Sequence, residues 1–182
     1  MRRDLVERAM RGDRDAFGVI ASEEIDHLNA IARLVMRDPD LAEDAVQEAL
    51  VRCWRQLPGL RDIERFDAWL YRILMRTVAD EFGRRRRFQA SVQSISIEPS
   101  IDDASGRLAD RDELAQGFQL LSIDHRAIVV LHHFVGLPMA EAAAALGIRT
   151  GTAKSRYHYA MSALRAALDA AARETSPGEA LA

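Results

Sequence analysis

Apolar residues recur at three- and four-residue intervals along most of this 182-residue chain, a spacing that places them on one face of an α-helix. Strand-like alternation is scarce, and residues 91–97 (SVQSISI) provide the one such stretch. The helical pattern is interrupted at residues 88–107, where Ser, Gln, Ile, Pro and Asp dominate without a helical period. We therefore expect an all-α fold in which two small helical domains are joined by a flexible linker.

Composition limits the classes of protein to which the chain can belong. The net charge is −3, so any binding of nucleic acid would depend on local basic patches. The single cysteine, Cys53, excludes an internal disulfide framework and a cysteine-based zinc site. No apolar run approaches the roughly 18 residues of a membrane span, and the N-terminus lacks the apolar core of a signal peptide. We expect a cytoplasmic protein without membrane insertion.

The first half predicts a series of amphipathic helices. Residues 4–36 read as a helical hairpin with Asp13 as the cap of its second helix, and Asp40 is the expected cap of the next helix. The clearest pattern runs from Leu41 to Leu57, and Cys53 falls on its buried face as a small core hydrophobe. The residues expected on that buried face are Ala42, Ala45, Val46, Ala49, Leu50, Cys53, Trp54 and Leu57.

Positive charge gathers at the end of the next helix, which follows a short charged loop at Leu60 to Arg65. Residues Arg72 to Arg87 carry six positive and two negative charges and finish in four successive arginines. A cationic last turn suits any helix dipole, but four arginines exceed what capping requires. A phosphate-binding surface is therefore favoured over a merely solvated charged face.

The second half predicts a helix-turn-helix. Asp124 is the expected cap of a helix that ends before Gly136, residues 139–146 form a short alanine-rich helix, and Gly147 makes the turn into a basic helix. From Arg149 to Leu168 there are four basic and no acidic residues, which suits base edges and phosphates. The alternative for this helix is a basic solvated surface with no ligand.

Sequence features of an enzyme are missing. His132 and His133 are adjacent, so on a helix they point about 100° apart, and no carboxylate or thiol stands at a ligand-like spacing beside them. We find no Ser-His-Asp grouping and no glycine-rich phosphate loop. We expect no catalytic residues, no metal site, no cofactor and no enzymatic activity.

Four segments, taken in order, resemble the extracytoplasmic-function (ECF, group IV) sigma factors of bacterial RNA polymerase, in the sigma-70 family. The similarity extends from Leu5 to Leu168. The segments are Gly12 to Phe17 (GDRDAF), Asp38 to Trp54 (DPDLAEDAVQEALVRCW), Phe66 to Arg87 (FDAWLYRILMRTVADEFGRRRR) and Leu131 to Leu168.

This resemblance implies a domain plan. Residues 1–87 would form a region 2 domain that binds core polymerase and the −10 element, and residues 88–107 would be the linker. Residues 108–173 would form a region 4 domain whose helix-turn-helix binds the −35 element, and residues 174–182 would be a disordered tail.

The implied function is that of an alternative sigma factor, which recruits core RNA polymerase to specific promoters and initiates transcription. The implied partners are the clamp and flap regions of core polymerase, promoter DNA and an anti-sigma factor, and the free protein would be a monomer. One alternative is a sigma-like decoy that titrates an anti-sigma factor without binding DNA, although such decoys usually carry a receiver domain. Another is an ordinary helix-turn-helix repressor, which leaves the first ninety residues unexplained.

The resemblance also assigns residues to three surfaces. In the family the loop before the Trp69 helix captures a flipped, unstacked base. The expected polymerase-binding residues are Asp44, Gln47, Glu48, Val51 and Arg52. The expected −10 residues are Arg61, Asp62, Ile63, Arg65, Trp69, Arg72, Arg76, Thr77, Asp80, Arg84 and Arg85. The expected −35 residues are Arg149, Thr150, Thr152, Lys154, Ser155, Arg156, His158 and Tyr159.

Several positions depart from the usual family pattern. Thr77 stands where asparagine is usual, Ala153 replaces a usual valine, and Tyr159 replaces a usual arginine. Losing the arginine removes one phosphate contact. We expect these changes to affect the promoter sequence more than the general function.

Overall fold

The computed structural model describes residues 2–93 and 117–174, and throughout these two ranges the regular elements are helices with no strand. The predicted all-α fold is confirmed. The first part contains α1 (Arg2–Met10), α2 (Arg14–Met36), α3 (Pro39–Gln56), the short 3-10 turns η1 (Leu57–Gly59) and η2 (Ile63–Arg65), and α4 (Phe66–Gln93). The second part contains α6 (Ile123–Val129), the π-turn η3 (Val130–Phe134), α7 (Met139–Leu146) and α8 (Thr150–Glu174).

The boundaries of the expected linker and tail fall partly outside the described residues. Helix α4 continues to Gln93, six residues beyond the expected end of the first domain, and α8 ends at Glu174. Residues 94–116, which include most of the expected linker, and residues 175–182 of the expected tail lie outside the described ranges.

Acidic and small polar side chains set the helix starts. Asp13 caps α2 as predicted, because its Oδ1 accepts from the backbone N–H groups of residues 15 and 16 at 3.0 Å. The predicted cap at Asp40 is wrong: Asp38 caps α3, since Pro39 fits the first helical position and leaves the residue before it as the cap. The predicted cap at Asp124 is also wrong, because Ser122 caps α6.

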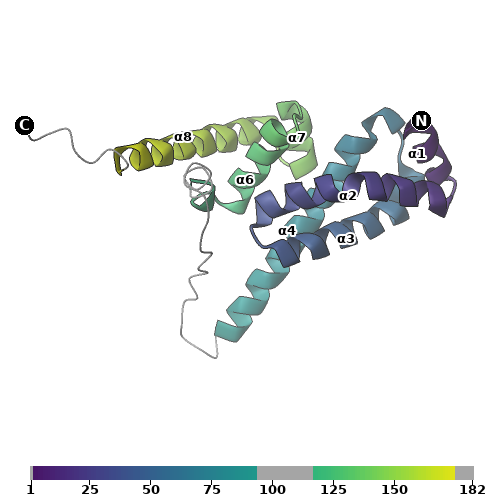
Figure 1. Ribbon diagram of the computed structural model, residues 1–182, viewed down its shortest axis with the longest axis horizontal. Coiled ribbons are helices and arrows are strands. Elements are labelled where there is room, and N and C mark those ends of the chain that lie inside the picture. Colours follow the sequence, from purple (N-terminus) through teal and green to yellow (C-terminus); the bar gives the residue numbers. More distant parts are fainter. Residues whose placement is uncertain (1, 94–116, 175–182) are drawn as a thin grey trace, which may run out of the picture.

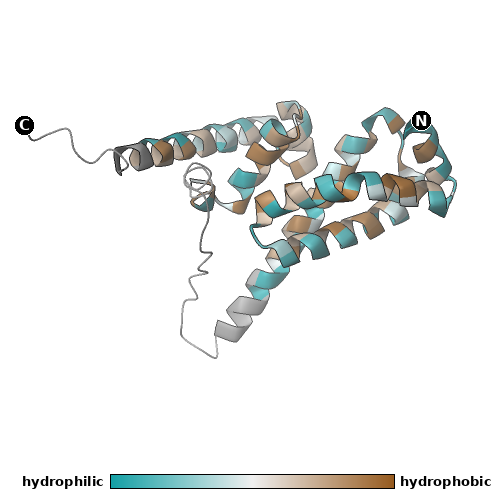
Figure 2. Ribbon diagram, in the orientation of Figure 1, coloured by the Kyte–Doolittle hydropathy of each residue, from teal (hydrophilic) through white to brown (hydrophobic). Residues whose placement is uncertain are grey.

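The first domain is a bundle in which α2, α3 and α4 pack together, with α1 covering one end (Figure 1). Each helix mixes hydrophilic and hydrophobic residues around its axis (Figure 2), as an amphipathic bundle requires. Cys53 is buried, and burial raises the pKa of its thiol to about 12, so it behaves as the core hydrophobe that was predicted. The largest fully buried side chains of this domain include Leu28, Ile31, Leu57, Leu70 and Leu74.

The second domain packs α6 and α7 against α8. Small residues line the contacts, because Ala142, Ala153 and Ala160 are all fully buried. Gly147 ends α7 in the left-handed conformation, with φ of 67°, which lets the chain turn sharply into α8. The short α7, glycine turn and long α8 together form the predicted helix-turn-helix.

The two domains lie against each other. Helix α7 packs on α4, while α6 and η3 pack on α2 (Figure 1). The ring of His27 on α2 is stacked with that of Phe134 on η3, with centroids 5.8 Å apart and an interplanar angle of 13°. Each domain therefore contributes an aromatic group to the shared surface.

Candidate nucleic-acid interface

The first three turns of α8 present a polar face to solvent. The inward side is fixed by Ala153 and Ala160, which are fully buried. The other sides of the helix carry five exposed residues of the predicted −35 set, namely Thr152, Lys154, Ser155, His158 and Tyr159, and two more, Arg149 and Thr150, are exposed at the start of the helix. Their hydroxyl, amine, guanidinium and imidazole groups are the donors and acceptors that read base edges and bind phosphates. Within the described ranges, the structure brings these residues together as one surface.

Two members of the −35 set already have partners on α6. Arg156 is half-buried and its Nη2 lies 3.0 Å from Oδ2 of Asp124. Tyr159 is 62% exposed, and its ring is stacked on that of His125 with centroids 4.7 Å apart. A partly exposed ion pair of this kind is weak, so the Arg156 guanidinium remains available to a competing phosphate.

The loop before α4 is held to the domain core by buried apolar residues, and a side-chain hydrogen bond within the loop caps its short helical turn. Leu57 and Leu60 are buried, whereas Arg61 and Asp62 are exposed. Oδ1 of Asp62 accepts from the backbone N–H of Glu64 at 3.1 Å, which forms the cap of η2. The loop therefore has a defined shape with charged side chains on its outer side.

Beyond the loop, α4 places Trp69, Arg72 and Arg76 on its outer side. Trp69 and Arg72 are half-buried, while Arg76 is exposed. Trp69 lies beside Phe66, with ring centroids 6.0 Å apart. An aromatic ring next to two guanidinium groups can stack a base while the cations follow the phosphate backbone.

Thr77 does not belong to this outer surface. Its side chain is 1% exposed, and its hydroxyl donates to the carbonyl oxygen of Ile73 at 3.0 Å. The helical phase of Thr77 is that of the buried Leu70 and Leu74. The assignment of Thr77 to the −10 set is therefore corrected, because its hydroxyl points into the bundle.

Two arginines of the run near the end of α4 have partners within the protein. Arg85 is half-buried and binds the carboxylate of Asp38, the cap of α3, while Arg84 pairs with Glu81 on its own helix. The backbone N–H of Leu41 and then Arg85 hold the pKa of Asp38 below its ordinary value. Arg84 and Arg85 therefore have a structural role, which the row of four arginines does not reveal in the sequence.

The outer side of α3 carries the predicted polymerase-binding residues. Asp44, Gln47 and Val51 are exposed, and Glu48 and Arg52 are half-buried. The guanidinium of Arg52 lies 2.8 Å from Oε1 of Glu48 and 2.6 Å from Oδ2 of Asp80 on α4. A residue expected to bind polymerase is thus paired with one expected at the −10 element.

Contact between the domains covers part of the α4 surface. A cavity between α4 and α7 is lined by Trp69 and Arg72 on one side and by Glu141 and Ala144 on the other. A larger cavity of about 340 Å³ has Arg76 of α4 and Arg156 of α8 among its lining residues. In this arrangement the two candidate DNA surfaces approach each other.

Metal sites and membrane spans were the two further possibilities raised by composition. Its His, Cys, Asp and Glu side chains form no group of three that could hold a metal ion. None of its helices is long and apolar enough to cross a membrane.

Comparison with known families and relatives gives matches in both halves. The family model for Sigma-70 region 2 matches residues 21–88, and the model for Sigma-70, region 4 matches residues 111–164. The RNA polymerase sigma-E factor of Streptomyces avermitilis is 35% identical over 144 residues, which cover 79% of this chain and 80% of the relative. The ECF RNA polymerase sigma factor SigL of Mycobacterium tuberculosis is 36% identical over 151 residues, covering 79% and 85%.

Solved structures agree with these matches. The sigma factor RpoE of Bartonella quintana, in complex with the anti-sigma factor NepR, is similar with a TM-score of 0.67 and 28% identity, covering 81% of this chain and 95% of that one. CnrH, in complex with the cytosolic domain of CnrY, is similar with a TM-score of 0.62 and 28% identity, covering 92% and 97%.

Proposed function

This chain belongs to the extracytoplasmic-function sigma factors of the sigma-70 family. From that premise we propose which of its surfaces bind the −35 element, the −10 element and core polymerase. As an alternative sigma factor, it recruits core RNA polymerase to promoters and initiates transcription, and it performs no enzymatic chemistry itself. The decoy alternative has no support among the relatives.

The exposed side of α8 reads the −35 element. One observation carries this assignment: exposed polar and basic residues occupy one side of α8, while Ala153 and Ala160 fix the other side against the domain core. The helix therefore has a single orientation in which its polar side can enter the major groove. Tyr159, held against His125, offers a ring edge and a hydroxyl where a phosphate-binding arginine is usual.

The loop Leu60 to Arg65 and the start of α4 read the −10 element. The ordered loop, the half-buried Trp69 and the cations Arg72 and Arg76 support this assignment. A shaped loop can hold an unstacked base, and guanidinium groups along α4 can bind the melted strand. The remaining −10 residues are Arg61, Asp62, Ile63, Arg65, Asp80, Arg84 and Arg85, with Thr77 excluded by its burial.

The polymerase holds the protein through both domains. The exposed Asp44, Gln47 and Val51 on α3 bind the clamp, with Glu48 and Arg52 beside them, and the second domain binds the flap. Polymerase binding fixes the spacing of two weak DNA contacts, which raises the effective concentration of the second contact once the first has formed. We place the protein in the cytoplasm, where it meets the polymerase.

An anti-sigma factor controls access to this protein. The two similar structures described above support this, because RpoE was solved with the anti-sigma factor NepR and CnrH with a domain of CnrY. The free protein is monomeric.

Binding to duplex −35 DNA tests the role of α8. The duplexes are taken from promoters selected out of a random library by the protein bound to core polymerase. Changing Lys154 to alanine should weaken binding and reduce the slope of log affinity against log salt by about 1. Arg165→Ala is the matched control, because Arg165 is also an exposed cation of α8 but lies three turns farther along the helix. Equal effects of the two changes would mean that α8 provides only diffuse charge.

A further inference from the structure

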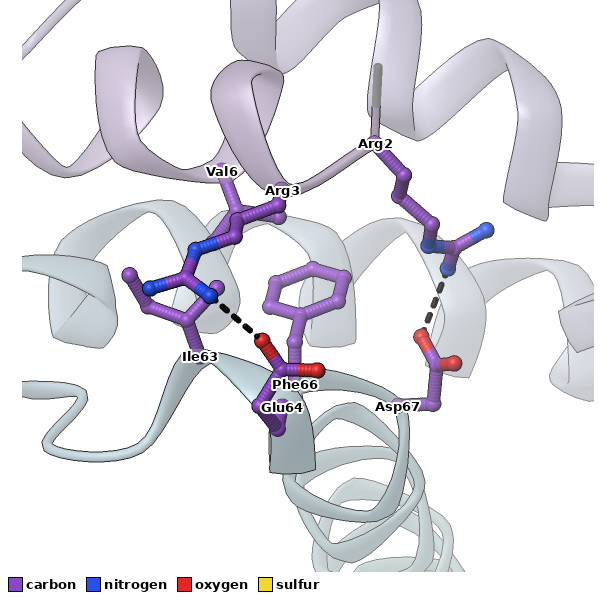
Figure 3. Close-up of a pocket in the computed structure, with 7 residues that line it drawn as sticks. All are labelled: Arg2, Arg3, Val6, Ile63, Glu64, Phe66 and Asp67. Atoms are coloured by element: carbon purple, nitrogen blue, oxygen red, sulfur yellow. Dashed lines mark hydrogen bonds and ion pairs between the residues drawn. The ribbon is translucent and has the colours of Figure 1, made fainter.

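Helix α1 lies directly against the loop that we assign to the −10 element. Figure 3 shows Arg2 and Arg3 pointing from α1 toward residues of η2 and the first turn of α4. Between them is a cavity of about 160 Å³ that is also lined by Val6 and Phe66. The Sigma-70 region 2 match begins at residue 21, so α1 lies outside the matched segment.

Arg2 connects two elements of the domain through one guanidinium group. Its Nη2 lies 2.7 Å from Oε1 of Glu24 on α2 and 2.6 Å from Oδ1 of Asp67 on α4. Its guanidinium carbon also lies 5.9 Å from the centre of the Phe66 ring. Because Glu24 is only 8% exposed, this contact ties the start of α4 to the interior of the bundle.

Arg3 holds the loop itself. Its Nη1 lies 3.0 Å from Oε1 of Glu64 in η2, and its Nε lies 3.1 Å from Oε1 of Glu7 on α1. Below this pair, Val6 is 1% exposed and packs against the apolar side of the loop. The loop is thus held by an apolar contact underneath and by an ion pair outside.

We propose that Arg2 and Arg3 are positioning residues for −10 recognition, which fix the loop Leu60 to Arg65 before DNA arrives. The proposal rests on the proposed function, in which this loop captures the unstacked base. Binding to a loop that is already ordered avoids the entropy cost of ordering it, and a fixed loop cannot adapt its shape to a base that fits poorly. Neither arginine needs to touch the DNA.

The same two arginines also neutralise carboxylates beside the loop. Without them, Glu64 and Asp67 would add uncompensated negative charge near the phosphates of the melted strand. Charge and order can be separated experimentally, because charge acts on all sequences alike whereas loop order acts on the choice of base.

The test measures discrimination between bases. Full-length protein bound to core polymerase is assayed with a single-stranded non-template oligonucleotide that carries a −10 sequence selected from a random library by the wild-type complex. Three further oligonucleotides change the base selected most strongly. The discrimination ratio is the affinity for the selected oligonucleotide divided by the mean affinity for the three changed ones.

Arg3→Gln should lower the discrimination ratio about two- to fivefold, the range expected from losing one exposed ion pair. The exchange Arg3→Glu with Glu64→Arg should restore most of that ratio, because the pair is re-formed with reversed signs. Arg8→Gln is the matched control: it removes an ion pair of α1 to Asp13, at 2.7 Å, that does not involve the loop, and should leave the ratio unchanged.

Arg2 is tested with the conservative change, because Arg2→Ala would leave the buried Glu24 without this partner and could unfold the domain. Arg2→Lys keeps the charge but replaces the guanidinium, whose Nη2 meets both carboxylates while its carbon lies over the Phe66 ring, with a compact ammonium group. It should lower the discrimination ratio while leaving affinity for core polymerase unchanged.

A variant of the loop itself distinguishes a failure of the positioning proposal from a failure of the −10 assignment. If Arg61→Ala changes the ratio but Arg3→Gln and Arg2→Lys do not, the loop reads the base and the positioning proposal is overturned. If the arginine variants weaken all four oligonucleotides equally, the ratio stays constant and α1 has only a structural or charge role, which also overturns it. If neither loop nor arginine variants change the ratio, the loop is not the reader and the proposed function fails at this site.

Discussion

The guanidinium of Arg126 donates from Nε to the backbone carbonyl oxygen of Val35 at 2.7 Å, joining residues that are 91 positions apart and belong to different domains. Its Nη1 also donates to the carbonyl oxygen of Leu121 at 2.5 Å. Val35 is in the last turn of α2, where carbonyl groups lack partners within the helix and a cation is favourable. Arg126 is 7% exposed, so this link is a buried part of the domain contact.

Replacing Arg126 with alanine should loosen the contact between the domains. Two buried carbonyl groups would lose a charged donor, and the free energy of unfolding should fall by about 2 kcal/mol. A fluorophore pair on exposed positions of α3 and α8 should report a longer or broader distance distribution. Arg37→Ala is the control, because Arg37 makes a longer, exposed bond of 3.3 Å to the carbonyl of Gln119. An unchanged distance in the Arg126 variant would show that other contacts hold the domains together.

Asp38 should contribute stability that disappears in acid. Its pKa in the folded protein is lowered by the backbone N–H of Leu41 and by Arg85, so the carboxylate form is favoured on folding. The contribution is complete above the ordinary pKa of 3.8 and is lost as pH falls through the lower folded value. Asp38→Ala should cost about 1 kcal/mol at pH 7, as for other helix caps, and progressively less as the pH falls through the lowered pKa of Asp38. A cost in chemical denaturation that does not depend on pH would contradict this account.

Cys53 should be unreactive in the folded protein. Burial raises the pKa of its thiol to about 12, so almost no thiolate exists at pH 8 and reagents cannot reach the sulfur. Alkylation by iodoacetamide, followed by mass spectrometry, should be slow in buffer and fast in denaturant. Rapid modification of the native protein would show that α3 opens readily.

Tyr159→Arg should add a phosphate contact at the −35 element. We expect tighter binding to duplex DNA and an increase of about 1 in the magnitude of the salt slope. Tyr159→Phe keeps the ring that stacks on His125 and should leave the slope unchanged. If Tyr159→Arg also leaves it unchanged, the side chain at this position points away from the phosphates.

Helical spacing predicted the architecture because burial on one face leaves a direct trace in the sequence. It identified the buried side of α3, including Cys53. Helix caps were less predictable, because α3 and α6 each have two candidate cap residues two positions apart. These are Asp38 and Asp40 for α3, and Ser122 and Asp124 for α6; in α3, Pro39 favours the earlier one.

Long-range polar contacts left no such trace. Arg126 binds backbone carbonyls, which every residue possesses, so no partner side chain marks the contact in the sequence. Arg2 and Arg3 sit in an N-terminal segment without a distinctive pattern, and their carboxylate partners come from α2, η2 and α4. At Thr77 the sequence did carry the information. Its helical phase is that of buried residues, but the family resemblance assigned it to the DNA surface, and the structure buries it.

Transcription from a library of random promoter sequences, with purified core polymerase and this protein, tests the central claim most directly. Sequencing the transcribed templates should reveal two selected blocks at a fixed spacing, one upstream and one next to the start site. His158→Ala, which removes an exposed imidazole from the −35 side of α8, should relax selection in the upstream block alone, and Arg61→Ala in the downstream block alone. Transcripts without two selected blocks, or no transcripts beyond those of core polymerase, would contradict the account.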